Sequence, residues 1–168
     1  AAELLLPTAS LAYPLVGKGE RFPFLTPSAL GFCDAPADQA ALSFAARLQG
    51  VAFVERLAYE VLDRVTGQEA PGDVFTTGGG SASDVWMQLR ADVTGRTLHR
   101  PQCHESAFGS AILAAANTVH GGLWDAMGRM LVVERSFHPD ALRGPKYDES
   151  YGAFRHRLEQ EGYLEDHS

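Results

Sequence analysis

The stretch VFTTGGGSASDVWMQLRADVTG, residues 74–95, is the part of the chain best suited to binding a ligand. A β-branched and aromatic run ends in Gly78, Gly79 and Gly80, and a polar helical pattern follows. Glycine adopts positive φ and has no Cβ, so the chain can turn sharply there and a flat or anionic ligand can approach the backbone. The following helix begins with unpaired N–H groups and a partial positive charge. The junction is therefore a candidate nucleotide site.

The residues alone leave two interpretations of this junction open, a nucleotide-binding ledge and a plain tight turn. It is not a P-loop, because the Lys-Ser/Thr ending is absent, and it does not match GxGxxG. The absence of a lysine favours an adenosine moiety over the β- and γ-phosphates. Ser81 or Ser83 can cap the helix, and Asp84 suits its first turn. Trp86 is expected to pack this helix onto the sheet.

The elements that must position the junction are strands alternating with helices. The pattern predicts a strand over 11–16 within an irregular stretch that ends at residue 37, and then one long helix over 38–67. Gly50 inside this helix indicates a close packing contact, and Gly67 is a plausible C-cap. The remaining predicted elements, within an α/β nucleotide-binding part over 73–163, are a strand over 73–77, a helix over about 82–93, a short strand over 96–100, helices over 105–120 and within 121–130, an extended segment over 131–139 and a helix over 147–163. This alternation is typical of α/β architecture.

Composition and charge exclude several kinds of partner. The 14 Lys and Arg against 21 Asp and Glu give a net charge of −7. This balance argues against nucleic acid or an anionic membrane as the main partner. The most apolar stretch, AILAAANTV, is far shorter than the roughly 20 residues that cross a bilayer. The two cysteines, Cys33 and Cys103, form no CxxC pair, so a reducing, cytoplasmic setting is expected.

Other chemistry-bearing residues carry weaker signals. Cys103 and His104 with Cys33 or His99 match no zinc spacing, so no metal site is predicted. A Ser/His/Asp triad is disfavoured because no GxSxG elbow is present. The neighbouring charges Glu20 and Arg21 are expected to form a solvated ion pair of little energetic value.

Five stretches of the chain resemble the FGGY carbohydrate kinases, which include xylulokinase, gluconokinase and glycerol kinase. TTGGGSASDVWMQLRADVTGRTL resembles their adenosine-binding segment, and ESAFGSAILAAANTVHGG resembles the small-residue helix that follows it. YPLVGKGERFPF resembles LPYLxGERTP, and GVAFVERLAYEVL resembles the long helix that follows it. YDESYGAFRHRLEQ resembles the closing helix. The matching positions are Tyr13, Leu15, Gly19, Glu20, Arg21, Pro23, Gly78, Gly79, Gly80, Ser83, Trp86, Gln88, Ala91, Asp92, Gly95, Glu105, Gly109, Ser110, Ala111, Ala114, Tyr147, Tyr151 and Phe154. Phe22 stands where the family usually has Thr, so the sugar is not assigned.

The resemblance implies a fold, an activity and a set of contacts. The fold would be ribonuclease-H-like, of the actin/hexokinase ATPase type, with residues 1–168 forming an incomplete C-terminal domain. The parent enzyme would transfer the γ-phosphoryl group of ATP to a sugar or polyol hydroxyl, with Mg²⁺. Gly79 and Gly80 would let adenine and ribose lie against the backbone, Ser83 would hydrogen-bond to the base or ribose, and Gly78 would complete the turn. No residue of this chain is implied to be catalytic or to bind metal.

Three parts of the family's site do not occur in this sequence: the DxGT phosphate segment, the Asp that acts as general base, and a second phosphate turn that resembles GTS. We therefore expect the isolated chain to lack kinase activity and the sugar to bind through an N-terminal domain outside it. An unpaired sheet edge predicts self-association, such as a homodimer. The alternative to a kinase is a non-catalytic nucleotide-binding module or pseudokinase of the same fold. A Rossmann NAD protein is disfavoured because the GxGxxG pattern and its later acidic residue are missing.

Overall fold

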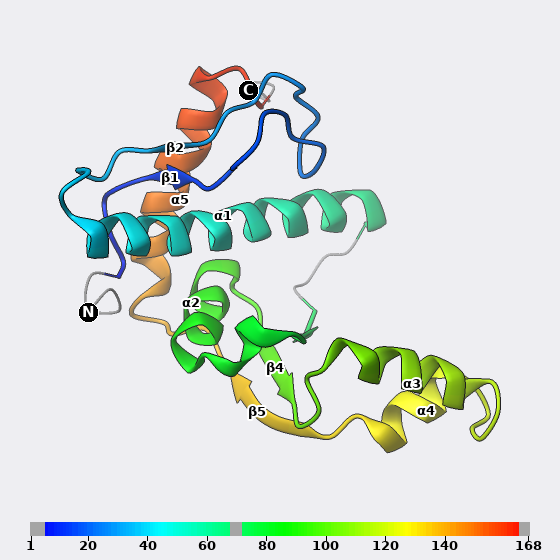
Figure 1. The fold of residues 1–168 in the computed structure, drawn as a ribbon. Helices are drawn as coiled ribbons and strands as arrows, with labels where there is room; N and C mark the ends of the chain where they lie inside the picture. The colour runs from blue at the N-terminus through cyan, green and yellow to red at the C-terminus, as the bar shows by residue number, and fades with distance from the viewer. Residues whose placement is uncertain (1–5, 68–71, 165–168) are drawn as a thin grey trace. The chain divides into compact units, whose positions relative to one another are not determined.

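The computed structural model describes residues 6–67 and 72–164 (Figure 1). The chain forms two compact units by its internal contacts. Unit 1 comprises Ala1–Pro71, Asp92–Gly95 and Pro139–Ser168, and unit 2 comprises Gly72–Ala91 and Arg96–His138. All 5 tyrosines of the sequence fall in unit 1 and both tryptophans fall in unit 2. The division of the chain at residues 37 and 67 stays a prediction.

Unit 1 is built around the long helix α1, Ala40–Thr66, which confirms the helix predicted over 38–67. The strands β1, Ala12–Tyr13, and β2, Phe32–Cys33, pair antiparallel beside it. The helix α5, Gly144–Gln160, completes the unit and starts three residues before the predicted helix, with a proline in its first turn. Proline is favoured there because its missing N–H has no partner within a helix in any case.

Aromatic side chains form the core of unit 1. The Phe53 ring centroid lies 5.6 Å from that of Tyr151 and 5.4 Å from that of Phe154. The ring of Tyr13 lies 6.4 Å from that of Phe154. All four side chains are buried. Clusters of this kind add about 0.5–1.5 kcal/mol per pair beyond the burial of apolar area.

Both expectations about the glycines of α1 are confirmed. A Cβ at Gly50 would overlap the carbonyl oxygen of Ala12, so β1 approaches the helix backbone where a side chain is missing. Gly67 adopts a left-handed conformation, with φ of 67°, and its N–H donates to the carbonyl oxygen of Asp63. The helix therefore ends at a glycine C-cap, because glycine meets no steric penalty there.

The pairing of Glu20 with Arg21 differs from the expected solvated ion pair. The hydroxyl group of Tyr13 donates to Glu20 Oε2 at 2.5 Å, and the backbone N–H of Arg21 donates to Glu20 Oε1 at 2.9 Å. Burial and this carboxylate raise the pKa of the Tyr13 hydroxyl. Glu20 thus connects its loop to the buried end of β1 through hydrogen bonds, whereas the Arg21 side chain is exposed.

Unit 2 contains a mixed sheet of three strands in the order β3-β4-β5. β3, Val74–Phe75, is parallel to β4, Leu98–Pro101, and β5, Val133–Phe137, is antiparallel to β4. After β3, residues 76–83 lead through a 3₁₀ turn, Gly79–Ala82, into α2, Asp84–Thr94, whose last residues belong to unit 1. The side chains that join this helix to the sheet are Met87, Ala91, Leu98 and Phe137, with Val74 against them.

A pair of helices completes unit 2 and lies side by side in Figure 1. They are α3, Ser106–Ala116, and α4, Leu123–Met130. They pack through Ile112, Ala116 and Ala126. The helix predicted over 105–120 ends at Ala116, and Gly122, whose φ is 136°, is the N-cap of α4. The structure is thus a mixture of helices and sheets, as the alternation of patterns predicted.

Candidate functional site

The Gly-rich junction folds into a turn that is closed by hydrogen bonds on its inner side. Gly78 has φ of 88°, a value that favours glycine, and its N–H donates to the carbonyl oxygen of His104 at 2.6 Å. The carbonyl oxygen of Gly78 accepts the N–H of Ser81 at 3.1 Å and the Ser81 hydroxyl at 2.7 Å. Ser81 is fully buried. The turn is therefore anchored at Gly78 and Ser81.

Ser83 is the residue that caps α2. Its Oγ accepts the N–H of Trp86 at 3.3 Å, and its own N–H donates to the carbonyl oxygen of Gly80 at 3.2 Å. Ser83 is exposed, so its hydroxyl faces solvent as well as the helix end. Of the two serines that the sequence offered as caps, Ser81 instead closes the turn.

The outer side of the turn is open at Gly79. A Cβ at Gly79 would meet none of the described atoms within 4 Å, and one at Gly80 would lie 3.4 Å from Nε1 of Trp86. Gly79 and Gly80 are exposed, whereas Gly78 is half-buried. A flat ligand can therefore reach the backbone at Gly79 and Gly80.

The expectation that Trp86 packs α2 onto the sheet is only partly met by its position. Met87, one residue later, occupies the core with Leu98. Trp86 is half-buried and lies beside Gly80, with the Arg90 guanidinium carbon 5.8 Å from its ring centroid. One helical position decides this, because successive residues point about 100° apart around an α-helix.

Arg100 on β4 contacts the turn, and it was missed from the sequence. Its Nη1 donates to the carbonyl oxygen of Ser81 at 3.0 Å and to Asp84 Oδ1 at 2.8 Å. Its Nε and Nη2 donate to the Glu134 carboxylate at 3.2 and 3.3 Å. The alternation in RTLHR puts Arg96, Leu98 and Arg100 on one face, and all three are buried, but the partners of Arg100 come from distant parts of the sequence.

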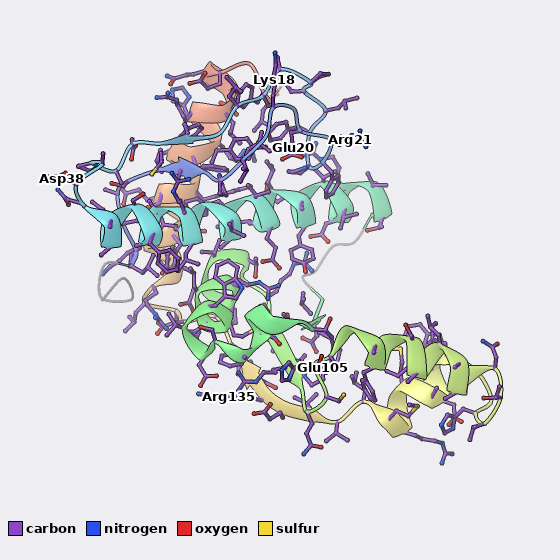
Figure 2. All side chains as sticks on the ribbon, viewed as in Figure 1. Lys18, Glu20, Arg21, Asp38, Glu105 and Arg135 are labelled. Atoms are coloured by element: carbon purple, nitrogen blue, oxygen red, sulfur yellow. The ribbon has the colours of Figure 1, made fainter. Side chains whose placement is uncertain are left out.

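Positive and negative charges beside the turn balance each other. Asp84, in the first turn of α2, also pairs with Arg135 of β5. The Arg135 side chain is labelled on β5 in Figure 2. The hydrogen bond to Asp84 raises the pKa of Arg100, so this guanidinium stays charged. Two arginines thus face the carboxylates of Asp84 and Glu134, and this cluster has no excess positive charge to attract a phosphate. The arrangement suits a neutral nucleoside better than a triphosphate.

The other sequence candidates are not assembled into a site. Cys33 is half-buried and Cys103 is exposed, and both are free thiols. Within residues 6–67 and 72–164, no group of three His, Cys, Asp or Glu is placed to hold a metal ion. In the same ranges, no helix combines the length and the apolar character that a bilayer crossing requires.

Comparisons with known proteins agree with this architecture. Residues 1–118 match the C-terminal domain of the FGGY family of carbohydrate kinases. The chain is 35% identical over 91 residues to L-xylulose/3-keto-L-gulonate kinase of Escherichia coli, and 33% identical over 98 residues to glycerol kinase of Agathobacter rectalis. These matches cover 51% and 53% of this chain but only 18% and 19% of the two relatives.

Among solved structures, the xylulose kinase of Lactobacillus acidophilus superimposes with a TM-score of 0.78 at 18% identity. The match covers 95% of this chain and 33% of that one, so it shows a shared fold over part of a longer protein. The chain spans about a fifth of the length of the curated relatives that it matches. Because the family match extends over most of its residues, the chain belongs to the FGGY family of carbohydrate kinases.

Proposed function

We propose that this chain supplies the adenosine-binding half of the nucleotide site in an ATP-dependent sugar or polyol kinase. The observation that carries the proposal is the open face of the turn at Gly79, in a chain of the FGGY family. The reaction would be transfer of the γ-phosphoryl group of ATP to a hydroxyl group. Such transfer depends on positioning and charge stabilisation, so the protein must hold the nucleotide in a fixed place.

The proposed contacts are those of a nucleoside. Adenine and ribose would lie against the exposed backbone of Gly79 and Gly80, where the missing side chains leave room. The Ser83 hydroxyl, already accepting the Trp86 N–H, would donate to the base or to the ribose. Gly78 would set the turn through its positive φ. No residue of the chain is assigned a catalytic role.

The remaining parts of the reaction would come from outside this chain. The balanced charges of Arg100, Arg135, Asp84 and Glu134 do not form a phosphate site, so the phosphates and Mg²⁺ would be held by other segments, as would the sugar. We extend the proposal to a ribonuclease-H-like fold of the actin/hexokinase type for the complete domain. The free thiols of Cys33 and Cys103 and the use of ATP support a cytoplasmic setting.

Replacing Gly79 by valine tests the proposal. The new side chain would fill the open face without disturbing the fold, so we expect MgADP affinity to fall by about tenfold or more, equivalent to about 1.4 kcal/mol. Isothermal titration calorimetry measures the affinity, and circular dichroism checks the fold. Gly128→Val is the matched control, since Gly128 also has open space around it but lies in α4.

Steady-state kinetics on a protein that carries this chain extends the test. Gly79→Val should raise the KM for ATP more than the KM for the sugar. Equal effects on both would contradict the assignment of this turn to adenosine. A protein that binds MgADP and phosphorylates no sugar or polyol would instead favour the non-catalytic nucleotide-binding module.

A further inference from the structure

Gly79 and Gly80 have no side chains that could hold their backbone in place, so neighbouring residues must hold it. A ligand that rests on backbone requires that backbone to be fixed before binding, since ordering it on binding would cost affinity. Two hydrogen bonds within the described part of the chain reach the turn from outside it: one to the His104 carbonyl oxygen from Gly78, and one from the Arg100 guanidinium to Ser81. His104 acts through its backbone and Arg100 through its side chain, so a mutation can remove the Arg100 contact.

Arg100 is placed to fix the turn and the start of α2 together. A single nitrogen, Nη1, donates both to the Ser81 carbonyl oxygen and to Asp84 Oδ1. Ser81 passes this restraint to Gly78 through its own hydroxyl, which donates to the Gly78 carbonyl oxygen. Both ends of the turn are therefore linked to one guanidinium group on β4.

The other side of the Arg100 side chain is held equally firmly. Its Nε and Nη2 donate to both oxygens of Glu134, and its guanidinium carbon lies 5.5 Å from the centroid of the Phe137 ring. Arg100 itself is only 7% exposed. Bidentate pairs of this kind give geometric specificity as well as energy, and a planar fork is needed to make them.

We infer that Arg100 is a positioning residue for the adenosine site, which it serves by fixing the backbone from Gly78 to Asp84 from behind. This inference rests on the proposed function and deepens it, since it adds a residue that would never touch the nucleotide. The guanidinium joins the turn, the start of α2 and β5 in one network, and the open side of Gly79 stays free for the ligand.

Arg135 provides a matched comparison within the same sheet. It lies opposite Arg100 in the β4–β5 register, pairs with the same Asp84, and has its guanidinium carbon 5.0 Å from the same Phe137 ring. Its side chain is about half exposed, and its hydrogen bond goes to the Asp84 carboxylate rather than to a carbonyl oxygen of the turn. A residue that only supported the sheet would resemble Arg135 in its effect on binding.

The experiment compares Arg100→Lys with Arg135→Lys in the 168-residue chain. Lysine keeps the charge but cannot reach Ser81, Asp84 and Glu134 at once. We expect Arg100→Lys to weaken MgADP binding by about tenfold in calorimetry, the scale of losing one buried charge-assisted hydrogen bond. Arg135→Lys should stay within about twofold, as is usual for an exposed ion pair. Amide hydrogen exchange over residues 78–83 should accelerate in Arg100→Lys alone.

The outcomes separate this inference from the proposed function. If the wild-type chain binds MgADP and the two lysine variants bind it equally well, Arg100 has no positioning role. If the wild-type chain binds no MgADP, the proposed function fails, and the inferred role of Arg100 in nucleotide binding fails with it. Hydrogen exchange still shows whether Arg100 holds the turn. Should Arg100→Lys fail to fold, Ser81→Ala interrupts the same connection at the Gly78 carbonyl oxygen, and unchanged MgADP affinity in that variant would overturn the inference.

Discussion

A methyl group added at Gly50 in unit 1 would overlap the carbonyl oxygen of Ala12, whereas one added at Gly79 in unit 2 would meet none of the described atoms within 4 Å. Gly50 is buried in the middle of α1, and Gly79 is exposed at the start of a 3₁₀ turn. Helix propensity alone makes glycine unfavourable at position 50 by about 1 kcal/mol relative to alanine. The close approach of β1 explains why glycine is present there.

The difference shows two separate reasons for a missing side chain. At Gly50 the space is occupied by the chain itself, and the fold requires the glycine. At Gly79 the space is open and the backbone has no positive φ, so the fold does not require a glycine there. A ligand resting on the turn would supply the reason that the fold does not.

The largest effect is expected from Gly50→Ala. The added carbon forces β1 away from α1, so the free energy of unfolding should fall by about 3 kcal/mol or more, at the upper end for overpacked cores. Chemical denaturation followed by circular dichroism measures this change. Gly152→Ala, within α5 and with open space around it, is the control and should stabilise the chain by about 0.5–1 kcal/mol. A Gly50→Ala protein as stable as the wild type would remove the distinction between the two glycines.

The next effect concerns alkaline pH and should be confined to the tyrosine-bearing unit 1. Burial, with the nearby charge of Asp92, raises the pKa of Tyr147 from 10.0 to about 12. The folded chain therefore retains a proton that the unfolded chain has released, and this contribution to stability is complete below pH 10 and is lost as the pH rises toward 12. Each such group contributes a slope of about 1.4 kcal/mol per pH unit.

Tyr147→Phe tests whether the Tyr147 hydroxyl causes this dependence of stability on pH. The variant should lose stability less steeply between pH 10 and 12 than the wild type does, as measured by denaturant unfolding at fixed pH values. Its stability at pH 7 serves as the control for the lost hydroxyl. An unchanged slope would mean that the hydroxyl of Tyr147 is not kept protonated by its surroundings.

The smallest effect compares the starts of two helices. Ser83 caps α2 with its side chain, whereas Gln39, at the matching position of α1, makes no side-chain cap hydrogen bond among the described residues. Ser83→Ala should cost about 1 kcal/mol of stability, and Gln39→Ala should cost little. Ser83→Asn keeps the cap and should restore stability while leaving the proposed nucleoside contact altered. Equal losses for Ser83→Ala and Gln39→Ala in thermal unfolding would contradict this view of α2.

Much of the local structure could be predicted from the sequence. The apolar repeat of 38–67 identified α1, and Gly67 marked its end, because both signals are local. The strand, turn and helix around Gly79 were equally clear. Of the pair β1–β2, only β1 was predicted, within the strand expected over 11–16. β2 was missed because it contains two residues, and a strand that short shows no alternation of apolar and polar residues.

The site was harder to complete than the fold. Gly78, Gly79, Gly80 and Ser83 could be named because the turn is contiguous in the chain. Arg100 could not, since its role depends on a carbonyl oxygen 19 residues earlier and a carboxylate 34 residues later. Contacts of this kind are set by the sheet register, which the sequence pattern of a four-residue strand does not determine.

The placement of both tryptophans in unit 2 has an optical consequence. Fluorescence excited at the red edge of aromatic absorption, where tryptophan absorbs and tyrosine does not, would arise from unit 2, because both tryptophans lie there. Trp124 is 81% exposed and already surrounded by water, so Trp86 beside Gly80 would dominate any change in emission. A Trp124→Phe chain would then contain a single emitter at the edge of the turn, and an adenine stacked there would quench it without any added dye.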